Sequence, residues 1–300
     1  KHPAKPQDIS TAIRSGNVNQ LKKLGKFDVN QSIADNGCTP LYIAAQNGNL
    51  DVVRYLAGEA HADVNQATAD DGSTPLFIAA EMGNLDMVHY LAGEAHADVN
   101  QAKTDTGSTP LYVAVEKDNL DVVRYLAGEA HANVNQARTD TGSTPLFIAV
   151  ENDNLDVVRY LFGEAHANVN QAKTDTGSIP LHMAAQNGNL DVVRYLASEA
   201  HADVNQGRTD NGATPLHMAA LNGNLDVVRY LAGEAHADVN QATTDDGTTP
   251  LHIAAQMDNL DAVRYLAGEA HADVNQARTD TGATPLFIAA QNDNFDIVRY

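Results

Sequence analysis

One stretch of the chain, residues 106–140, reads TGSTPLYVAVEKDNLDVVRYLAGEAHANVNQARTD, and the stretches on either side differ from it at only a handful of positions. Its glycine returns at an unbroken interval of 35 residues, as Gly37, Gly72, Gly107, Gly142, Gly177, Gly212, Gly247 and Gly282. A period of roughly 20 to 50 residues is typical of repeat architectures, in which each unit buries its apolar face against its neighbours. The sequence therefore predicts a linear stack of one small unit rather than ordinary globular domains.

The period divides the 300 residues into an incomplete first copy, seven full copies and a shortened last copy, which we predict to form one continuous domain. Residues 1–35 are a degenerate copy without the Thr-Pro-Leu start, residues 36–280 are the full copies, and residues 281–300 are a truncated one. Residues 1–30 carry six basic and two acidic side chains, which fits the polar outer surface of a capping repeat. Because the last copy stops within its second helix, we expect the chain to be part of a longer repeat protein.

Each unit carries the start and stop signals of two short helices. In the copy quoted above, Thr109 is placed to cap a first helix through its hydroxyl, and Pro110 occupies the first helical position, where a missing N–H costs nothing. The helix is predicted to end at a residue in the left-handed conformation, which is Asp118 here and a glycine such as Gly83 in other copies. Asn119 is predicted to cap a second helix with one apolar face.

The segment between units, residues 133–142 in this copy, has an extended Val-Asn followed by a polar turn, which predicts a short hairpin. Helices of about two turns are marginal alone, because an isolated helix shorter than about 12 residues hardly forms in water. Each unit therefore has to be stacked on its neighbours. The predicted fold class is all-α, a solenoid of stacked helix-turn-helix units with projecting β-hairpin loops.

The motifs T-P-L-x-x-A, G-N-L-D-V-V-x-x-L and A-D-V-N, in this order within each unit, resemble those of the ankyrin repeat family. The resemblance covers residues 8–300 and implies an array with a concave face, formed by hairpins and first helices, that binds a protein partner. The units have 35 residues rather than the roughly 33 of the family. One extra residue lies within residues 58–62 and one within residues 66–71 of the first full copy. The longer hairpins leave open how far the concave face extends, but they do not change the predicted fold.

The charge of the chain argues against nucleic acid and membranes as partners. It has 19 basic and 39 acidic side chains and a net charge of −20, which oppose attraction to phosphate backbones and anionic lipids. No apolar run approaches the roughly 18 residues of a membrane span. Cys38 is the single cysteine, so a disulfide framework and a cysteine-rich zinc site are both excluded, and a reducing compartment fits. We expect an intracellular protein, cytoplasmic or nuclear, without membrane insertion.

Comparison of the copies with one another shows which positions the stack leaves free. They gather at the end of the first helix and at one position of the hairpin, which in ankyrin-like proteins map to the concave, partner-binding face. The predicted contact residues are Lys103, Arg138, Lys173, Arg208 and Arg278 in the hairpins and Glu81, Met82, Tyr112, Glu116, Lys117, Glu151, Asn152, Leu221 and Met257 on the first helices. Neutral drift at solvated positions is the competing interpretation for any one of them.

The hairpin position is basic in five of seven copies, although the chain beyond residue 30 has 13 basic and 37 acidic side chains. Stacked helices lie about 8 to 10 Å apart, near the Debye length at physiological salt, so this ladder of bases suits an extended acidic partner. The alternative is that each base pairs with the aspartate two residues further on, as Arg138 would with Asp140.

Histidines form two further columns. His61 and its equivalents stand at the end of the second helix, where we expect them to close the helix near its negative dipole end. Zinc is not expected there, because its ligand atoms all lie about 2 Å from the ion whereas these histidines are one repeat apart. A response to pH below about 6.5 is the alternative role.

The position after the Thr-Pro-Leu motif, which is Ile-Pro-Leu in one copy, is histidine in three copies, and the resemblance implies that His182, His217 and His252 each form a hydrogen bond within their own turn. Aromatic residues replace histidine in five other copies, and for these we predict half-buried packing rather than a ligand site. They are Tyr42, Phe77, Tyr112, Phe147 and Phe287.

Catalysis requires different groups that converge on one point, whereas a periodic chain offers each group only as a row one repeat apart. We therefore predict no enzymatic activity, no cofactor and no metal. The predicted function is that of a monomeric, non-catalytic scaffold for protein–protein interaction. Two interpretations remain beside it: the targeting arm of a larger enzyme whose catalytic domain lies outside this chain, and a mechanical spacer without a specific partner.

Overall fold

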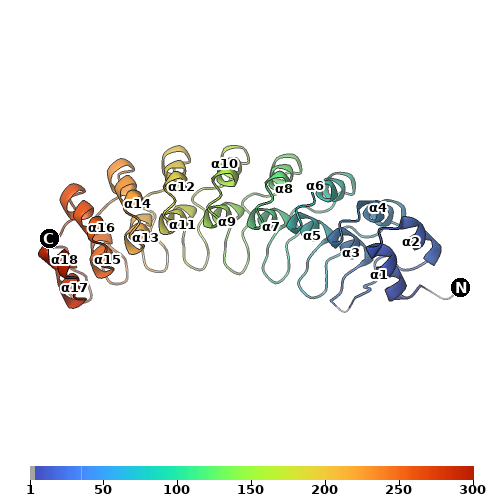
Figure 1. Cartoon of the computed structure of the whole chain (residues 1–300), viewed down its shortest axis with the longest axis horizontal. Coiled ribbons are helices and arrows are strands. Elements are labelled where there is room, and N and C mark those ends of the chain that lie inside the picture. Colours follow the sequence, from blue (N-terminus) through green and yellow to red (C-terminus); the bar gives the residue numbers. More distant parts are fainter. Residues whose placement is uncertain (1–3, 35) are drawn as a thin grey trace. The chain divides into compact units, whose positions relative to one another are not determined.

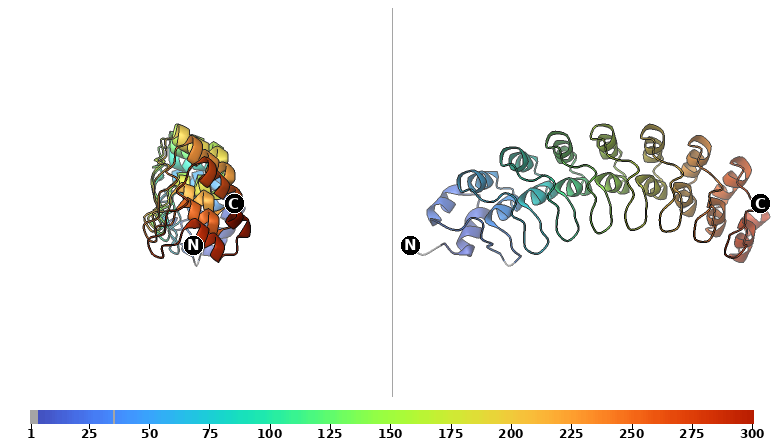
Figure 2. Two further views of the ribbon diagram at one scale, coloured as in Figure 1. Left: turned by 90° about the vertical axis from the view of Figure 1, so that its left-hand side faces the viewer. Right: turned by 180° about the vertical axis from the view of Figure 1, so that it is seen from behind.

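The computed structural model describes residues 4–34 and 36–300. They form two compact units, one ending at Asp140 and the other beginning at Thr141. Within each unit the first helices of successive copies pack side by side in chain order (Figure 1). The second helices lie on one side of them and the loops on the other, as the reverse view in Figure 2 also shows. The predicted all-α stack of helix-turn-helix copies is confirmed within each unit.

The helices of the N-terminal unit are α1 (Pro6–Arg14), α2 (Val18–Leu24), α3 (Pro40–Gln46), α4 (Leu50–Arg54), α5 (Pro75–Glu81), α6 (Leu85–Val88), α7 (Pro110–Glu116) and α8 (Leu120–Arg124), with π-helical turns at Tyr55–Glu59, His89–Glu94 and Tyr125–Glu129. Those of the C-terminal unit are α9 (Pro145–Glu151), α10 (Leu155–Gly163), α11 (Pro180–Asn187), α12 (Leu190–Arg194), α13 (Pro215–Leu221), α14 (Leu225–Arg229), α15 (Pro250–Gln256), α16 (Leu260–Arg264), α17 (Pro285–Gln291) and α18 (Phe295–Arg299), with π-helical turns at Tyr195–Glu199, Tyr230–Glu234 and Tyr265–Glu269.

The first helix of the copy at residues 106–140, α7, starts and ends as predicted. The Thr109 hydroxyl accepts the backbone N–H of Tyr112 at 3.1 Å, and Pro110 is the first residue of α7. Asp118 follows that helix with φ at 60°, and Gly83 follows α5 with φ at 67°. The two residue types therefore occupy the same left-handed stop, because both tolerate a positive φ better than most side chains do.

Asn119 stands at the start of α8 as predicted, but the capping role of its side chain was wrong. The amide instead donates hydrogen bonds to the carbonyls of Ala80 at 3.0 Å and Glu81 at 3.2 Å, at the end of α5 in the preceding copy. The last carbonyls of a helix have no partner within the helix, so this asparagine satisfies them from the neighbouring repeat. It thereby joins two repeats rather than completing one helix.

The second helices accommodate their extra residue by widening. After the regular turns of α8, the N–H of Ala130 bonds to the carbonyl of Tyr125, which is the five-residue spacing of a π turn. The N–H of Ala132 then bonds to the carbonyl of Leu126, six residues earlier. Residues 155–163 remain α-helical throughout, and this copy has Phe162 where its sisters have alanine. The Phe162 ring packs edge-on against Tyr195 of the next copy, with ring centres 6.2 Å apart.

The loops between copies reverse the chain, but the prediction of β-hairpins was wrong. Among residues 4–34 and 36–300 no β-strand is present. The N–H of Lys103 bonds to the carbonyl of Ser108 within one loop, and the N–H of Thr139 bonds to the carbonyl of Thr106 in the preceding loop, each at 2.9 Å. Such isolated bonds close the loops and link them to each other without building the continuous pairing of a β-ladder.

Candidate functional site

The loops that carry the basic residues lie directly over the starts of the first helices of the preceding copy. The Lys103 ammonium is 5.5 Å from the centre of the Phe77 ring, and the Arg138 guanidinium is 5.5 Å from that of Tyr112. In the C-terminal unit Lys173 lies over Phe147 in the same way, at 5.3 Å. Each cation therefore faces an aromatic ring, an arrangement that contributes about 0.5 to 2 kcal/mol in proteins.

These aromatic side chains are more deeply buried than predicted. Tyr112, which we expected to contact a partner, is only 3% exposed and lies beneath Arg138. Phe77 and Phe147 are buried as well, because a residue of the next loop covers each ring. Phe287 differs, since it is 58% exposed. Packing is thus the role of the buried rings.

The five basic loop residues are held in place by carboxylates. Arg138 binds Asp140 at 2.5 Å, and Arg208 binds Asp210 at the same distance. Lys173 pairs with Asp175 in its own loop, while Lys103 and Arg278 pair with the equivalent aspartates, Asp105 and Asp280. The alternative that each base pairs with the aspartate two residues further on is confirmed. A partner approaching these loops therefore meets neutralised pairs rather than a row of free positive charges.

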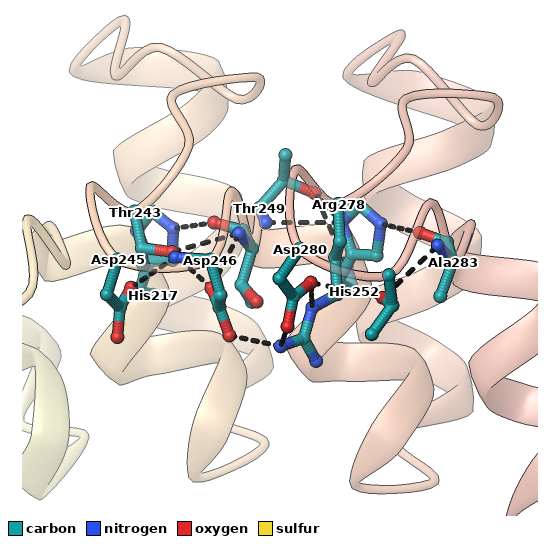
Figure 3. Close-up of polar contacts among 11 residues, drawn as sticks. His217, Thr243, Asp245, Asp246, Thr249, His252, Arg278, Asp280 and Ala283 are labelled. Carbon is teal, nitrogen blue, oxygen red and sulfur yellow. Dashed lines mark hydrogen bonds and ion pairs between the residues drawn. The ribbon is translucent and has the colours of Figure 1, made fainter.

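Two loops depart from this pattern because threonine replaces the base. In the C-terminal unit the Thr243 hydroxyl donates to Asp246 at 2.7 Å, and the N–H of Thr248 donates to the same carboxylate at 3.0 Å (Figure 3). Arg278 of the following loop also binds Asp246. Burial alone would raise the pKa of Asp246, but these hydrogen bonds and the nearby guanidinium lower it to about 2.

The N-terminal unit repeats this arrangement at Asp71. The Thr68 hydroxyl donates to its carboxylate at 2.6 Å, and the Lys103 ammonium of the next loop lies 2.8 Å away. Burial opposes ionisation here too, yet the hydrogen bonds from Lys103, Thr68 and Ser73 hold the pKa of Asp71 well below its ordinary range. Asp71 and Asp246 are therefore ionised and serve as fixed acceptors between neighbouring repeats.

The three histidines after Pro-Leu form the hydrogen bond within their own turn, as predicted, and a second bond that the sequence did not predict. Nδ1 of His217 accepts the backbone N–H of Thr214 at 3.1 Å, and its Nε2 lies 3.1 Å from the carbonyl oxygen of Thr248 in the next copy. This fixes the tautomer with hydrogen on Nε2. Because burial disfavours the charged ring, the pKa values of His182 and His217 are lowered to about 4.

The ends of the first helices carry exposed side chains. Met82 is 61% exposed, Met257 48% and Leu221 39%. Glu116 and Lys117 are also exposed, with their charged groups 3.9 Å apart. Glu151 and Asn152 are exposed at the same positions in the C-terminal unit, whereas Glu81 is half-buried.

A groove of the C-terminal unit brings several of these residues together. Its walls come from α13 and α15, including Met218, Leu221, Ile253 and Met257, and its rim from the loop with Thr243, Asp245 and Asp246 and from Arg278. A more polar groove of the N-terminal unit lies between Asp71, Glu81, Lys103, Glu116 and Arg138. Both grooves lie along the loops and first helices rather than along the second helices.

A family profile described as ankyrin repeats, in three copies, matches residues 9–103, 95–173, 165–243 and 235–300. The chain belongs to the ankyrin repeat family. Ankyrin repeats are generally modules for protein–protein interaction and are generally non-catalytic. No curated protein is significantly similar to this chain.

The ankyrin array shows no sign of a metal centre or a membrane span in the part that the structure describes. There, histidines, cysteine and carboxylates do not form any group of three that would hold a metal ion. His61 and its equivalents instead take a positive φ, 54° to 59°, after the π-helical turn or, at His166, after α10. No described helix is long and apolar enough to cross a membrane.

Sequence reasoning missed the two acidic ankyrin loops. Thr68 and Thr243 were noted only as the two copies without a basic residue at this loop position. In both copies a second aspartate, Asp71 or Asp246, precedes the glycine. That paired change was visible in the sequence, and it signals that these two loops have a different charge from the others.

Proposed function

We propose that the chain is a non-catalytic scaffold that binds a protein partner through the face formed by the loops and the first helices. One observation carries the proposal. Between residues 36 and 270, all of which the structure describes, the large apolar side chains classed as exposed are Met82, Leu221 and Met257. All three stand at the end of a first helix, and none lies on a second helix or elsewhere on the loops.

Exposed apolar side chains at two adjacent positions of the repeat favour an interface over a solvated surface. Burial of apolar area against a partner contributes about 25 cal/mol per Å². Leu221 and Met257 offer such area in the C-terminal unit, and Met82 offers it in the N-terminal unit. The sister copies have glutamine, glutamate, asparagine or lysine at the same positions. The fold therefore does not require apolar residues there, and binding supplies a reason for them.

The charged groups beside these residues support binding rather than catalysis. Arg138, Arg208 and Arg278 are each engaged by the aspartate of their own loop, and Arg278 also by Asp246, so these cations form fixed ion pairs. We place the protein inside the cell, where its single cysteine stays reduced.

The test replaces the exposed apolar residues by those of sister copies: Met82→Asn, Leu221→Gln and Met257→Asn in one variant. Asn47 and Gln186 show that the fold accepts these residue types at the end of a first helix. Partners are captured from a lysate of the native cell and quantified by mass spectrometry. We expect the triple variant to lose the partners that the original chain enriches.

The control removes exposed charges beyond the second helices, with Glu94→Gln, Glu129→Gln and Glu164→Gln, and we expect it to retain those partners. Equal capture by the triple variant and the original chain would refute the proposed surface. A spacer would enrich no partner at all, and a targeting arm would enrich one while the longer chain also carries a catalytic domain.

A further inference from the structure

Two loops combine an unusual charge with an exposed methionine. The loops at residues 68–72 and 243–247 read TADDG and TTDDG, and Met82 and Met257 directly follow the last residues of the first helices after them. The five loops that begin with a base, at residues 103, 138, 173, 208 and 278, each have a single aspartate, and no methionine follows their first helices at that position. The apolar and acidic features therefore occur together, twice.

In the C-terminal unit this combination leaves a carboxylate without a cation. Every base in the column pairs with the aspartate of its own loop, whereas Thr243 bonds to Asp246 and provides no charge for Asp245. Asp245 accepts the backbone N–H of Asp246 at 2.9 Å and is exposed. Within the part of the chain that the structure describes, no lysine or arginine lies within 4.0 Å of it.

Asp245 stands on the rim of the groove whose wall carries Leu221 and Met257. The N-terminal unit has Gln46 in place of Leu221, so the larger apolar wall belongs to the C-terminal unit. An occupant of this groove gains by covering two apolar side chains and by bringing a cation to one exposed carboxylate.

We propose that this groove binds a peptide segment of a partner protein in which large apolar side chains alternate with arginine or lysine. Arginine suits the site best, because its guanidinium forms paired hydrogen bonds with a carboxylate while its methylene groups lie on apolar surface. This inference rests on the proposed function and names the chemistry of the partner at one site.

Three fluorescein-labelled nonapeptides test the chemistry of the occupant. The probe is GSRLRLRSG, with fluorescein at the N-terminus and an amide at the C-terminus. In one control peptide all three arginines are replaced by glutamate, and in the other both leucines are replaced by serine. Fluorescence anisotropy measures their binding to the full chain at low and at physiological salt. We expect the probe to bind at least about tenfold more tightly than either control peptide, and to weaken as salt is added.

Two variants test whether the probe binds in this groove. Thr243→Arg with Asp246→Thr gives this loop the pattern of residues 278–282, so that the new arginine pairs with Asp245 in the way that Arg278 pairs with Asp280. Leu221→Gln with Met257→Asn restores the polar residues of sister copies. We expect each variant to keep its helical circular dichroism and to bind the probe about tenfold more weakly.

The matched control, Glu164→Gln with Glu269→Gln, changes the net charge of the unit by the same amount at exposed positions just beyond the second helices. It should bind the probe as the original chain does. Equal or tighter binding of the glutamate peptide, no binding of the probe, or the same loss in the control would overturn the inference. If substitution at the helix ends abolishes partner capture but the probe peptide does not bind, only this inference is refuted. If partner capture is unchanged by substitution at the helix ends, the proposed function is refuted.

Discussion

The ammonium of Lys103 lies 2.8 Å from the carboxylate of Asp71, which belongs to the loop of the preceding repeat. Both side chains are largely buried, with 19% and 33% of their surface exposed. The same ammonium pairs with Asp105 and faces the Phe77 ring. One side chain thus joins two repeats through a salt bridge and an aromatic contact.

Replacing Lys103 by alanine should therefore lower the free energy of unfolding by about 1 to 2 kcal/mol at pH 7, because Asp71 keeps its charge but loses its cation. Urea unfolding followed by circular dichroism measures the change. Lys117→Ala is the control, since Lys117 is exposed and contacts only its neighbour Glu116 at 3.9 Å among its ion pairs. If Lys103→Ala loses no more unfolding free energy than the control, the contacts of Lys103 with Asp71 and Phe77 do not stabilise the fold.

The buried histidines predict a loss of stability in mild acid. An unfolded histidine has a pKa near 6.5, whereas those of His182 and His217 in the fold are about 4. The unfolded chain therefore binds more protons between these values, so stability is fully present above pH 6.5 and falls as pH drops toward 4. Each histidine should cost about 2 kcal/mol between pH 7.5 and pH 5.

Substitution His217→Phe, the residue found at the equivalent Phe147, should flatten this dependence. Urea unfolding at pH 7.5 and pH 5 measures the difference, and the exposed His236→Asn serves as the control. If His217→Phe and the original chain lose the same stability between the two pH values, the buried imidazole is not the cause.

Glycine at the loop position has two separate tasks, which two substitutions distinguish. Gly107 has φ at 72°, and a Cβ there would come within 2.5 Å of the backbone nitrogen of Thr139. Gly282 has φ at 69°, but a Cβ there would meet nothing within 4 Å. Gly282→Ala should cost about 1 kcal/mol from backbone strain, and Gly107→Ala about 2 kcal/mol or more, because the neighbouring loop must also move.

Thermal unfolding of the two variants checks this order. Equal destabilisation would mean that φ alone explains the periodic glycine, and that the close approach of neighbouring loops carries no cost.

Phe162 offers a test of packing between second helices. Phe162→Ala restores the residue of the sister copies and removes the edge-on contact with Tyr195, so we expect a loss of about 1 kcal/mol. A double-mutant cycle with Tyr195→Ala isolates the ring contact. A coupling energy near zero would assign the effect to burial alone.

Local structure was predictable where it depends on residues close together in the chain. Thr109 caps its helix through a bond to Tyr112 three residues away, and Asp118 ends that helix through its own φ. The exposed helix ends at Met82 and Met257 were also predictable, because variation among copies marks positions that the stack does not constrain.

The site was less predictable wherever a neighbouring repeat supplies the contact. Tyr112 was expected at the surface and is buried, because Arg138 of the next loop covers it. Asn119 was expected to cap its own helix and instead bonds to carbonyls of the preceding repeat.

The sequence by itself determined the repeat, its two short helices, their left-handed stops and its membership of an all-α stack, since short-range backbone preferences decide these features. Only the tertiary structure decided which repeated positions contact each other in neighbouring copies. Examples are the salt bridge between Lys103 and Asp71 and the hydrogen bond between His217 and Thr248. Those contacts join residues 31 to 39 positions apart in different copies. A periodic sequence gives every column the same spacing, so the stacking of one copy on the next selects the partners.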